Sequence, residues 1–101
     1  MAKVGFPDYY RPVTVTATAM EQLYGTVTDE DTVFEFSEPV TSFFVYNKGR
    51  QVVFFNKDAP ATINHQPLLP TAGIGVDVNC KEVHCICRPG ETTEVNIIGV
   101  R

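Results

Sequence analysis

From residue 32 onward, the sequence is a succession of short apolar runs separated by turn residues. The runs occupy residues 32–37, 40–46, 51–55, 74–78, 83–87 and 94–100. They are rich in Val, Ile, Phe and Tyr, which fit the pleated surface of a sheet, while Gly, Pro, Asn and Asp stand between them. Short strands in such regular succession are typical of two packed antiparallel sheets. We therefore predict an all-β fold.

The length of 101 residues supports one domain. Residues 13–19 alternate Val or Ala with Thr, which predicts a further strand with one buried face. With this strand and a short one at 61–65, the prediction is a single antiparallel β-sandwich of about eight strands, Greek-key or jelly-roll-like. The predicted domain spans residues 13–101. Residues 1–12 form an extended N-terminal arm, because they hold two prolines that exclude a helix.

The positions of glycine and proline predict the type of two turns. Residues 47–50 predict a hairpin between 40–46 and 51–55, because Gly49 adopts positive φ without steric cost. Residues 88–91 have Pro and Gly at the two central positions, which is the type II preference.

Three segments are less regular. Residues 20–25 predict either a single helical turn that ends in glycine or a loop. Residues 66–73 contain two prolines and predict a loop. The apolar phase of the last strand slips between Ile97 and Ile98, which predicts a bulge near Gly99.

Residues 43–45 and 53–55 are apolar without alternation. Such runs indicate strands that are covered on both faces, or strands with one face covered by a partner.

Charge and hydropathy exclude two classes of partner. The chain has 12 acidic and 8 basic residues, a net charge of −4, and no Lys/Arg cluster, so we expect no nucleic-acid binding. No apolar run approaches the roughly 20 residues of a membrane helix, and we expect no membrane association. The first residues lack the apolar core of a signal peptide. We expect the chain to be made and folded in a cytosol.

The three cysteines are Cys80, Cys85 and Cys87. Their spacing is atypical of zinc knuckles, and His84 alternates to the opposite strand face. We interpret them as buried small hydrophobes and predict neither a metal nor a cofactor. A disulfide from Cys80 to a neighbouring strand and disulfides between subunits stay open.

No convergent catalytic set is recognisable. The only adjacent Cys–His pair lies on opposite faces of one strand, and Glu82, Glu91 and Glu94 fall near turns or on predicted wet faces. We therefore predict that the protein has no catalytic residues and is not an enzyme.

The arm at residues 1–12 carries Phe6, Tyr9 and Tyr10. These residues either pack on their own domain or dock onto a neighbouring subunit. A proline-stiffened segment loses less entropy on docking, so the three aromatic residues are the candidate partner-binding residues.

Residues 36–100 resemble small structural proteins of tailed bacteriophage virions. The likeness lies in an aromatic strand that ends at Asn47, a second strand that ends at Asn56, and a proline-bounded loop at 67–73. It closes on Pro-Gly-Glu-Thr-Thr-Glu-Val-Asn-Ile at residues 89–97.

The resemblance implies a non-enzymatic virion protein that is made in the host cytoplasm. Its first expected role is capsid decoration: a homo-oligomer that binds the capsid lattice through the arm and a sheet face. The partner would be the major capsid protein or another virion protein. A place at the neck, tail or fibre base is an alternative. A further alternative from the residues is a carbohydrate-binding module, with Tyr24 or Tyr46 in place of the absent Trp.

Overall fold

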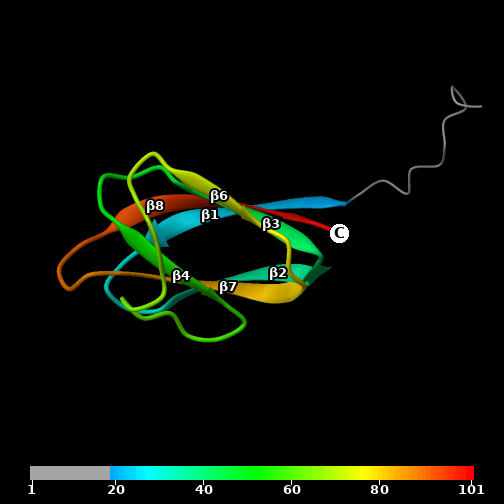
Figure 1. The fold of residues 1–101 in the computed structure, drawn as a ribbon, viewed down its shortest axis with the longest axis horizontal. Coiled ribbons are helices and arrows are strands. Elements are labelled where there is room, and N and C mark those ends of the chain that lie inside the picture. Colours follow the sequence, from blue (N-terminus) through cyan, green and yellow to red (C-terminus); the bar gives the residue numbers. More distant parts are fainter. Residues whose placement is uncertain (1–18) are drawn as a thin grey trace, which may run out of the picture.

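The computed structural model describes residues 19–101, which fold into two antiparallel sheets packed face to face (Figure 1). Sheet A has the order β1-β8-β3-β6, and sheet B has the order β2-β7-β4-β5. The strands are β1 (Met20–Val27), β2 (Thr32–Val40), β3 (Ser42–Asn47), β4 (Val53–Lys57), β5 (Gln66–Leu68), β6 (Gly73–Val76), β7 (Cys80–Cys87) and β8 (Thr93–Val100).

Successive strands alternate between the two sheets, except that β4 and β5 pair within sheet B. Two four-stranded sheets joined in this order form a jelly roll. The predicted β-sandwich is thus confirmed. The predicted hairpin at residues 47–50 is wrong, because β3 lies in sheet A and β4 in sheet B. The turn carries the chain from one sheet to the other.

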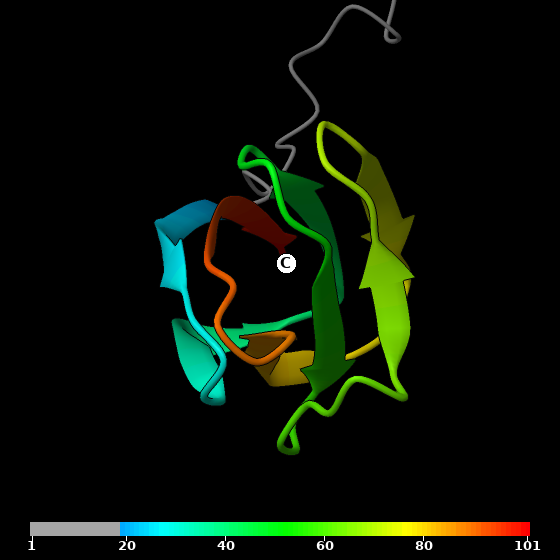
Figure 2. The same cartoon turned by 90° about the vertical axis from the view of Figure 1, so that its left-hand side faces the viewer.

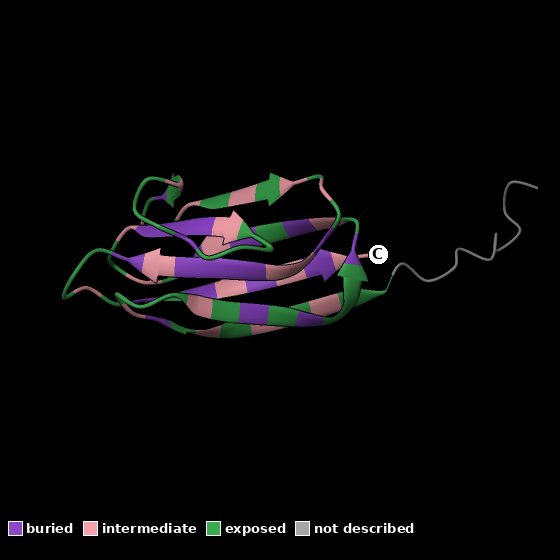
Figure 3. Cartoon of the chain, turned by 90° about the horizontal axis from the view of Figure 1, so that it is seen from below, coloured by how far each residue is buried: buried purple, intermediate pink, exposed green. Residues whose placement is uncertain are grey.

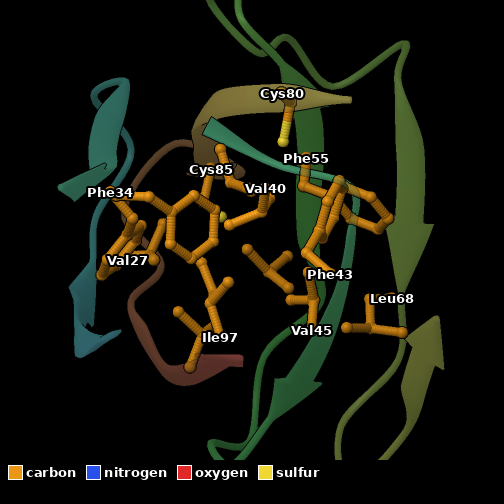
Figure 4. Packing of buried hydrophobic residues seen from close by; sticks show 14 of the residues in the cluster. Val27, Phe34, Val40, Phe43, Val45, Phe55, Leu68, Cys80, Cys85 and Ile97 are labelled. Atoms are coloured by element: carbon orange, nitrogen blue, oxygen red, sulfur yellow. The ribbon is translucent and has the colours of Figure 1, made fainter. Parts of the chain in front are cut away.

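The core lies between the sheets (Figure 4). Along most strands, buried residues alternate with more exposed ones (Figure 3). Phe43 from sheet A and Phe55 from sheet B meet edge to face, with ring centroids 6.2 Å apart and an interplanar angle of 82°. The other buried members of this cluster are Val27, Phe34, Phe36, Val40, Val45, Val53, Leu68, Cys80, Val83, Cys85, Cys87, Val95 and Ile97.

The corner between β3 and β4 is organised by the fully buried side chain of Asn47. Its amide nitrogen donates to the carbonyl oxygens of Gln51 (2.7 Å) and Leu68 (3.0 Å). Its amide oxygen accepts from Gly49 N (3.0 Å) and Thr93 Oγ1 (2.7 Å). One side chain therefore joins β3, the turn, β5 and β8.

The first described strand differs from its prediction. Residues 20–25 belong to β1, not to a helical turn or a loop. The charged Glu21 hides the alternation because it turns to the side of β2, where it accepts from Ser37 N (3.0 Å) and Arg101 Nη1 (3.2 Å). The strand predicted at residues 13–19 lies, except for Ala19, outside the described residues, and Ala19 itself is not in a strand.

Other expectations about boundaries also changed. The short strand predicted at 61–65 is instead a turn, and β5 lies inside the predicted proline-bounded loop. The register of β8 is continuous against both neighbours, so there is no bulge near Gly99. The turn at 88–91 is confirmed as type II in character: Gly90 has φ +79°, and Glu91 N donates to the carbonyl oxygen of Arg88 (3.0 Å).

The three cysteines are buried, as the sequence predicts, and they are free, so Cys80 forms no disulfide with a neighbouring strand. Burial raises the pKa of the Cys80 and Cys87 thiols to about 11, and it raises the pKa of Cys85 as well. Thiols with such pKa values are poor nucleophiles at neutral pH. Within residues 19–101, no group of three or more His, Cys, Asp or Glu residues is placed to hold a metal ion. The same residues contain no helix that could span a membrane.

Candidate binding surfaces

The outer face of sheet A is apolar and aromatic, although no described part of the chain covers it. Its most exposed members are Tyr24, at 75%, Met20, at 67%, and Phe44, at 43%. We call this surface the aromatic face. It comprises Met20, Gln22, Tyr24, Phe44, Tyr46, Asn96 and Ile98.

Strand register places these side chains in transverse rows. Tyr24 of β1 lies opposite Asn96 of β8, which lies opposite Tyr46 of β3. The neighbouring row runs from Gln22 through Ile98 to Phe44. Because adjacent strands are about 4.8 Å apart, the two tyrosines stand roughly 10 Å apart with an amide between them.

Two glycines of the edge strand β6 determine how Phe44 lies. Gly73 and Gly75 are its neighbours on the outer face. A Cβ atom on Gly73 would overlap the ring of Phe44 and one on Gly75 would lie 3.9 Å from it, so the ring extends over β6 toward Gly73. Because the glycines have no side chains, the Phe44 ring forms the apolar surface at this edge of sheet A.

The outer face of sheet B is different, because the chain itself covers the part formed by β4 and β7, although Val33 of β2 stays exposed. Ala61, in the loop between β4 and β5, donates its N–H to Asp31 Oδ1 (2.8 Å) and is buried. Phe54 points outward from β4 yet is only 4% exposed, with the Arg88 guanidinium 5.2 Å from its ring centroid. The continuous apolar run of β4 is therefore covered on both faces, which is the first of the two alternatives that the sequence left open. That of β3 leaves Phe44 exposed.

Beneath this cover, His84 of β7 is buried between two carboxylates. Its Nδ1 lies 2.7 Å from Asp31 Oδ2, and its Nε2 lies 2.9 Å from Glu82 Oε1. Burial alone would lower the pKa of His84, but the two hydrogen bonds and the two negative charges outweigh it and raise the pKa. The imidazolium form can donate from both nitrogens, whereas the neutral form donates from only one.

The pH dependence of the free energy of unfolding should reveal the contribution of the two bonds from His84 to Asp31 and Glu82. A histidine whose pKa is raised by folding adds stability that is fully present below its unfolded pKa of about 6.5 and is lost as pH rises through the folded pKa. Replacing His84→Gln should therefore cost most stability near pH 6 and progressively less above it. Urea unfolding of both proteins between pH 5.5 and 9 measures this difference. If the difference in free energy of unfolding between the two proteins does not change with pH, the bonds of His84 do not depend on its positive charge.

The edge strands β5 and β6 lie on the same side of the sandwich (Figure 2). A second apolar feature, a groove of about 300 Å³, lies at this side. Its floor is formed by Phe43, Phe55, Ile74 and Val76, and its rim by Asn56, Lys57, His65 and Gln66. On the opposite side of the sandwich, the bonds between Glu21 and Ser37 join the two sheets.

The predicted partner-binding residues Phe6, Tyr9 and Tyr10 lie outside the described residues. Of the three glutamates predicted to be solvated, Glu82 instead binds His84. Tyr24 and Tyr46, considered separately in the sequence, come together in one row. The sequence does not reveal the role of Phe44, because which face of β3 is uncovered depends on strand pairing.

The sequence matches no protein-family model, and no curated protein matches it significantly. Among solved structures, a match described as the crystal structure of PirA has 14% sequence identity and a TM-score of 0.45. It covers 79% of this chain and 93% of that one.

Proposed function

We propose that this protein is a non-enzymatic structural component of a tailed-phage virion, with capsid decoration as its first role. The observation that supports this proposal is the aromatic face. Exposed apolar patches rimmed by polar groups mark sites of protein association. Aromatic residues and Met are enriched in such interfaces, and charged residues are depleted from their centres. Tyr24, Met20 and Phe44 fit this description.

Copies per particle test the proposal and separate its two variants. Quantitative mass spectrometry of purified virions would count this chain against the major capsid protein. Hundreds of copies support decoration of the shell. Six, twelve or a small multiple supports the neck, tail or fibre base. Absence from particles would refute the virion proposal.

Replacing Tyr24→Ser should weaken binding to capsids that lack the protein by roughly 30-fold, as for an aromatic residue that contributes strongly to an interface. The reason is that Tyr24 is the most exposed large side chain of the aromatic face. Titration of capsids with labelled protein, followed by sedimentation, measures the affinity.

Leu69→Ser is the matched control for this substitution. Leu69 is exposed to a similar extent (62%) but lies in the loop between β5 and β6, and not on the three strands that carry the aromatic face. If both variants bind as tightly as the unmodified protein, the aromatic face is not the docking surface.

One observation favours a second candidate, which is carbohydrate binding. Two tyrosine rings about 10 Å apart, with an amide between them, resemble a platform on which two sugar rings could stack while their hydroxyls bond to Asn96. A glycan array probed with the protein and with Tyr46→Ser discriminates the two candidates. Glycan binding that is lost in the variant would favour carbohydrate binding. Together with absence of the chain from virions, this result would establish carbohydrate binding over the virion proposal.

A further inference from the structure

We propose that the groove at the side of β5 and β6 binds a small aryl carboxylate, with the rings of the ligand between the two sheets and its carboxylate against Lys57 and His65. This inference goes beyond the proposed function and does not depend on a place in a virion.

The groove is a place where the core is incomplete. Ile74 and Val76 point inward from β6, yet both remain half-buried. The edge strand of the opposing sheet, β5, has only three residues and is too short to cover them. Phe43 and Phe55 form the floor. The apolar part of a ligand placed here would leave water for aromatic and aliphatic carbon, which favours binding.

The volume and the lining of the groove indicate the body of the ligand. An apolar cavity of roughly 150 Å³ can hold one benzene molecule, and the groove has about 300 Å³. A body of two fused rings is therefore the expected size. Phe43 and Phe55 already form an edge-to-face pair at the floor, and such rings offer both faces and edges to a further aromatic ring.

Lys57 supplies the charge that selects an anion. In β4 it pairs with the fully buried Val83, so it belongs to the inward face of sheet B, at the rim of the groove. Within residues 19–101 Lys57 forms no ion pair. The neighbouring carboxylate of Asp58 accepts from two backbone N–H groups of β7. Among the described residues that line the groove, none is acidic, so its charge is complementary to an anion.

His65 provides a second donor at the rim. The backbone N–H of Thr62 donates to its Nδ1 (2.8 Å), so the neutral ring carries its proton on Nε2. In the part of the chain that the structure describes, Nε2 has no hydrogen-bond partner. A carboxylate has two oxygens and can accept from both Lys57 and His65. It gains more than a neutral amide does, because hydrogen bonds between charged groups are stronger.

The test uses the full chain in solution with naphthalene-2-carboxylate as the probe. Shifts in nitrogen–proton correlation spectra should saturate with a Kd below about 1 mM, as for a ligand of this size. The largest shifts should fall on the amides of Phe55, Gln66 and Val76. The neutral naphthalene-2-carboxamide should bind about fivefold more weakly. The proposal is overturned by a lack of saturation, by shifts confined to the aromatic face, or by equal affinity for the two compounds.

Lys57→Gln tests the charge, because it removes the ammonium group and keeps most of the side-chain length. It should weaken binding of the carboxylate by about fivefold and leave binding of the carboxamide within about twofold. Lys48→Gln is the matched control: Lys48 is also exposed, but it follows the far end of β3 and does not line the groove. If Lys57→Gln binds the carboxylate as tightly as Lys48→Gln does, Lys57 does not select the anion and the proposal is wrong.

Val76→Phe tests the location. Val76 is half-buried at the groove, so the larger side chain extends into the open volume rather than into the packed core. It should weaken binding of both compounds by at least about tenfold, while thermal unfolding confirms that the domain is folded. Undiminished binding by this variant would place the ligand elsewhere and overturn the proposal. None of these results changes the count of copies in virions, so the two proposals fail separately.

Discussion

Replacing Asn47→Ala is expected to destabilise the protein by about 4 kcal/mol. The substitution removes four hydrogen bonds at once. The bonds with the Leu68 carbonyl oxygen and the Thr93 hydroxyl are buried, and those with the Gln51 carbonyl oxygen and the Gly49 N–H are partly buried. Each unsatisfied buried group costs roughly 1–3 kcal/mol, although relaxation of the turn recovers part of it. Because a domain of this size is stable by only about 5–15 kcal/mol, the variant should be close to unfolding at 37 °C. Urea denaturation followed by circular dichroism measures the loss.

Asn96→Ala is the matched control for this prediction. Asn96 is also in sheet A, but it faces outward, and among the described residues its side chain has no hydrogen-bond partner. We expect this variant to stay within about 0.5 kcal/mol of the unmodified protein. If Asn47→Ala lost less than 1 kcal/mol, the corner between the sheets would not depend on the side chain.

The second large effect is expected at Gly99. This residue lies on the inward face of β8, and a Cβ atom there would stand 2.5 Å from the Phe36 ring and 2.7 Å from a methyl group of Val40. Both neighbours are almost completely buried and have no free space to move into. Gly99→Val should therefore overpack the core, costing about 3 kcal/mol and lowering Tm by roughly 10–20 °C. Differential scanning calorimetry measures the shift.

Gly75→Ala provides the corresponding control in the same sheet. Its added Cβ would lie 3.9 Å from the Phe44 ring, an ordinary van der Waals contact. We expect Tm to change by no more than about 3 °C. A large loss at both positions would indicate that sheet A tolerates no side chain in place of glycine, and the specific clash with Phe36 would then not be the cause.

Several elements of the fold were predictable because their signals are local. The alternation Phe34, Phe36 against Val33, Glu35 assigns an inner and an outer face to β2, and the structure agrees. Val83, Cys85 and Cys87 were likewise placed on one buried face of β7. The Pro-Gly pair at residues 89 and 90 defined its turn, because only the geometry of four consecutive residues is involved.

Other elements were mispredicted where a distant contact overrides the local signal. Gly49 suggested a hairpin, yet Asn47 binds backbone groups of β5 and the hydroxyl of Thr93, which pulls the turn into a corner between the sheets. Glu21 concealed β1, because its inward charge is compensated by Ser37 and Arg101, 16 and 80 residues away. Local patterns carry no information about such partners.

The sequence by itself determined that this chain forms an all-β sandwich with buried cysteines, because alternation and turn chemistry act between near neighbours. Only the tertiary structure decided which apolar strand stays uncovered. Phe54 and Phe44 look alike in the sequence, but the chain covers the first and leaves the second exposed beside Tyr46. The gathering of Tyr24, Asn96 and Tyr46 in one row depends on strand order and register. Both are set by packing between residues far apart in the chain, which is why the candidate binding surfaces emerge only from the fold.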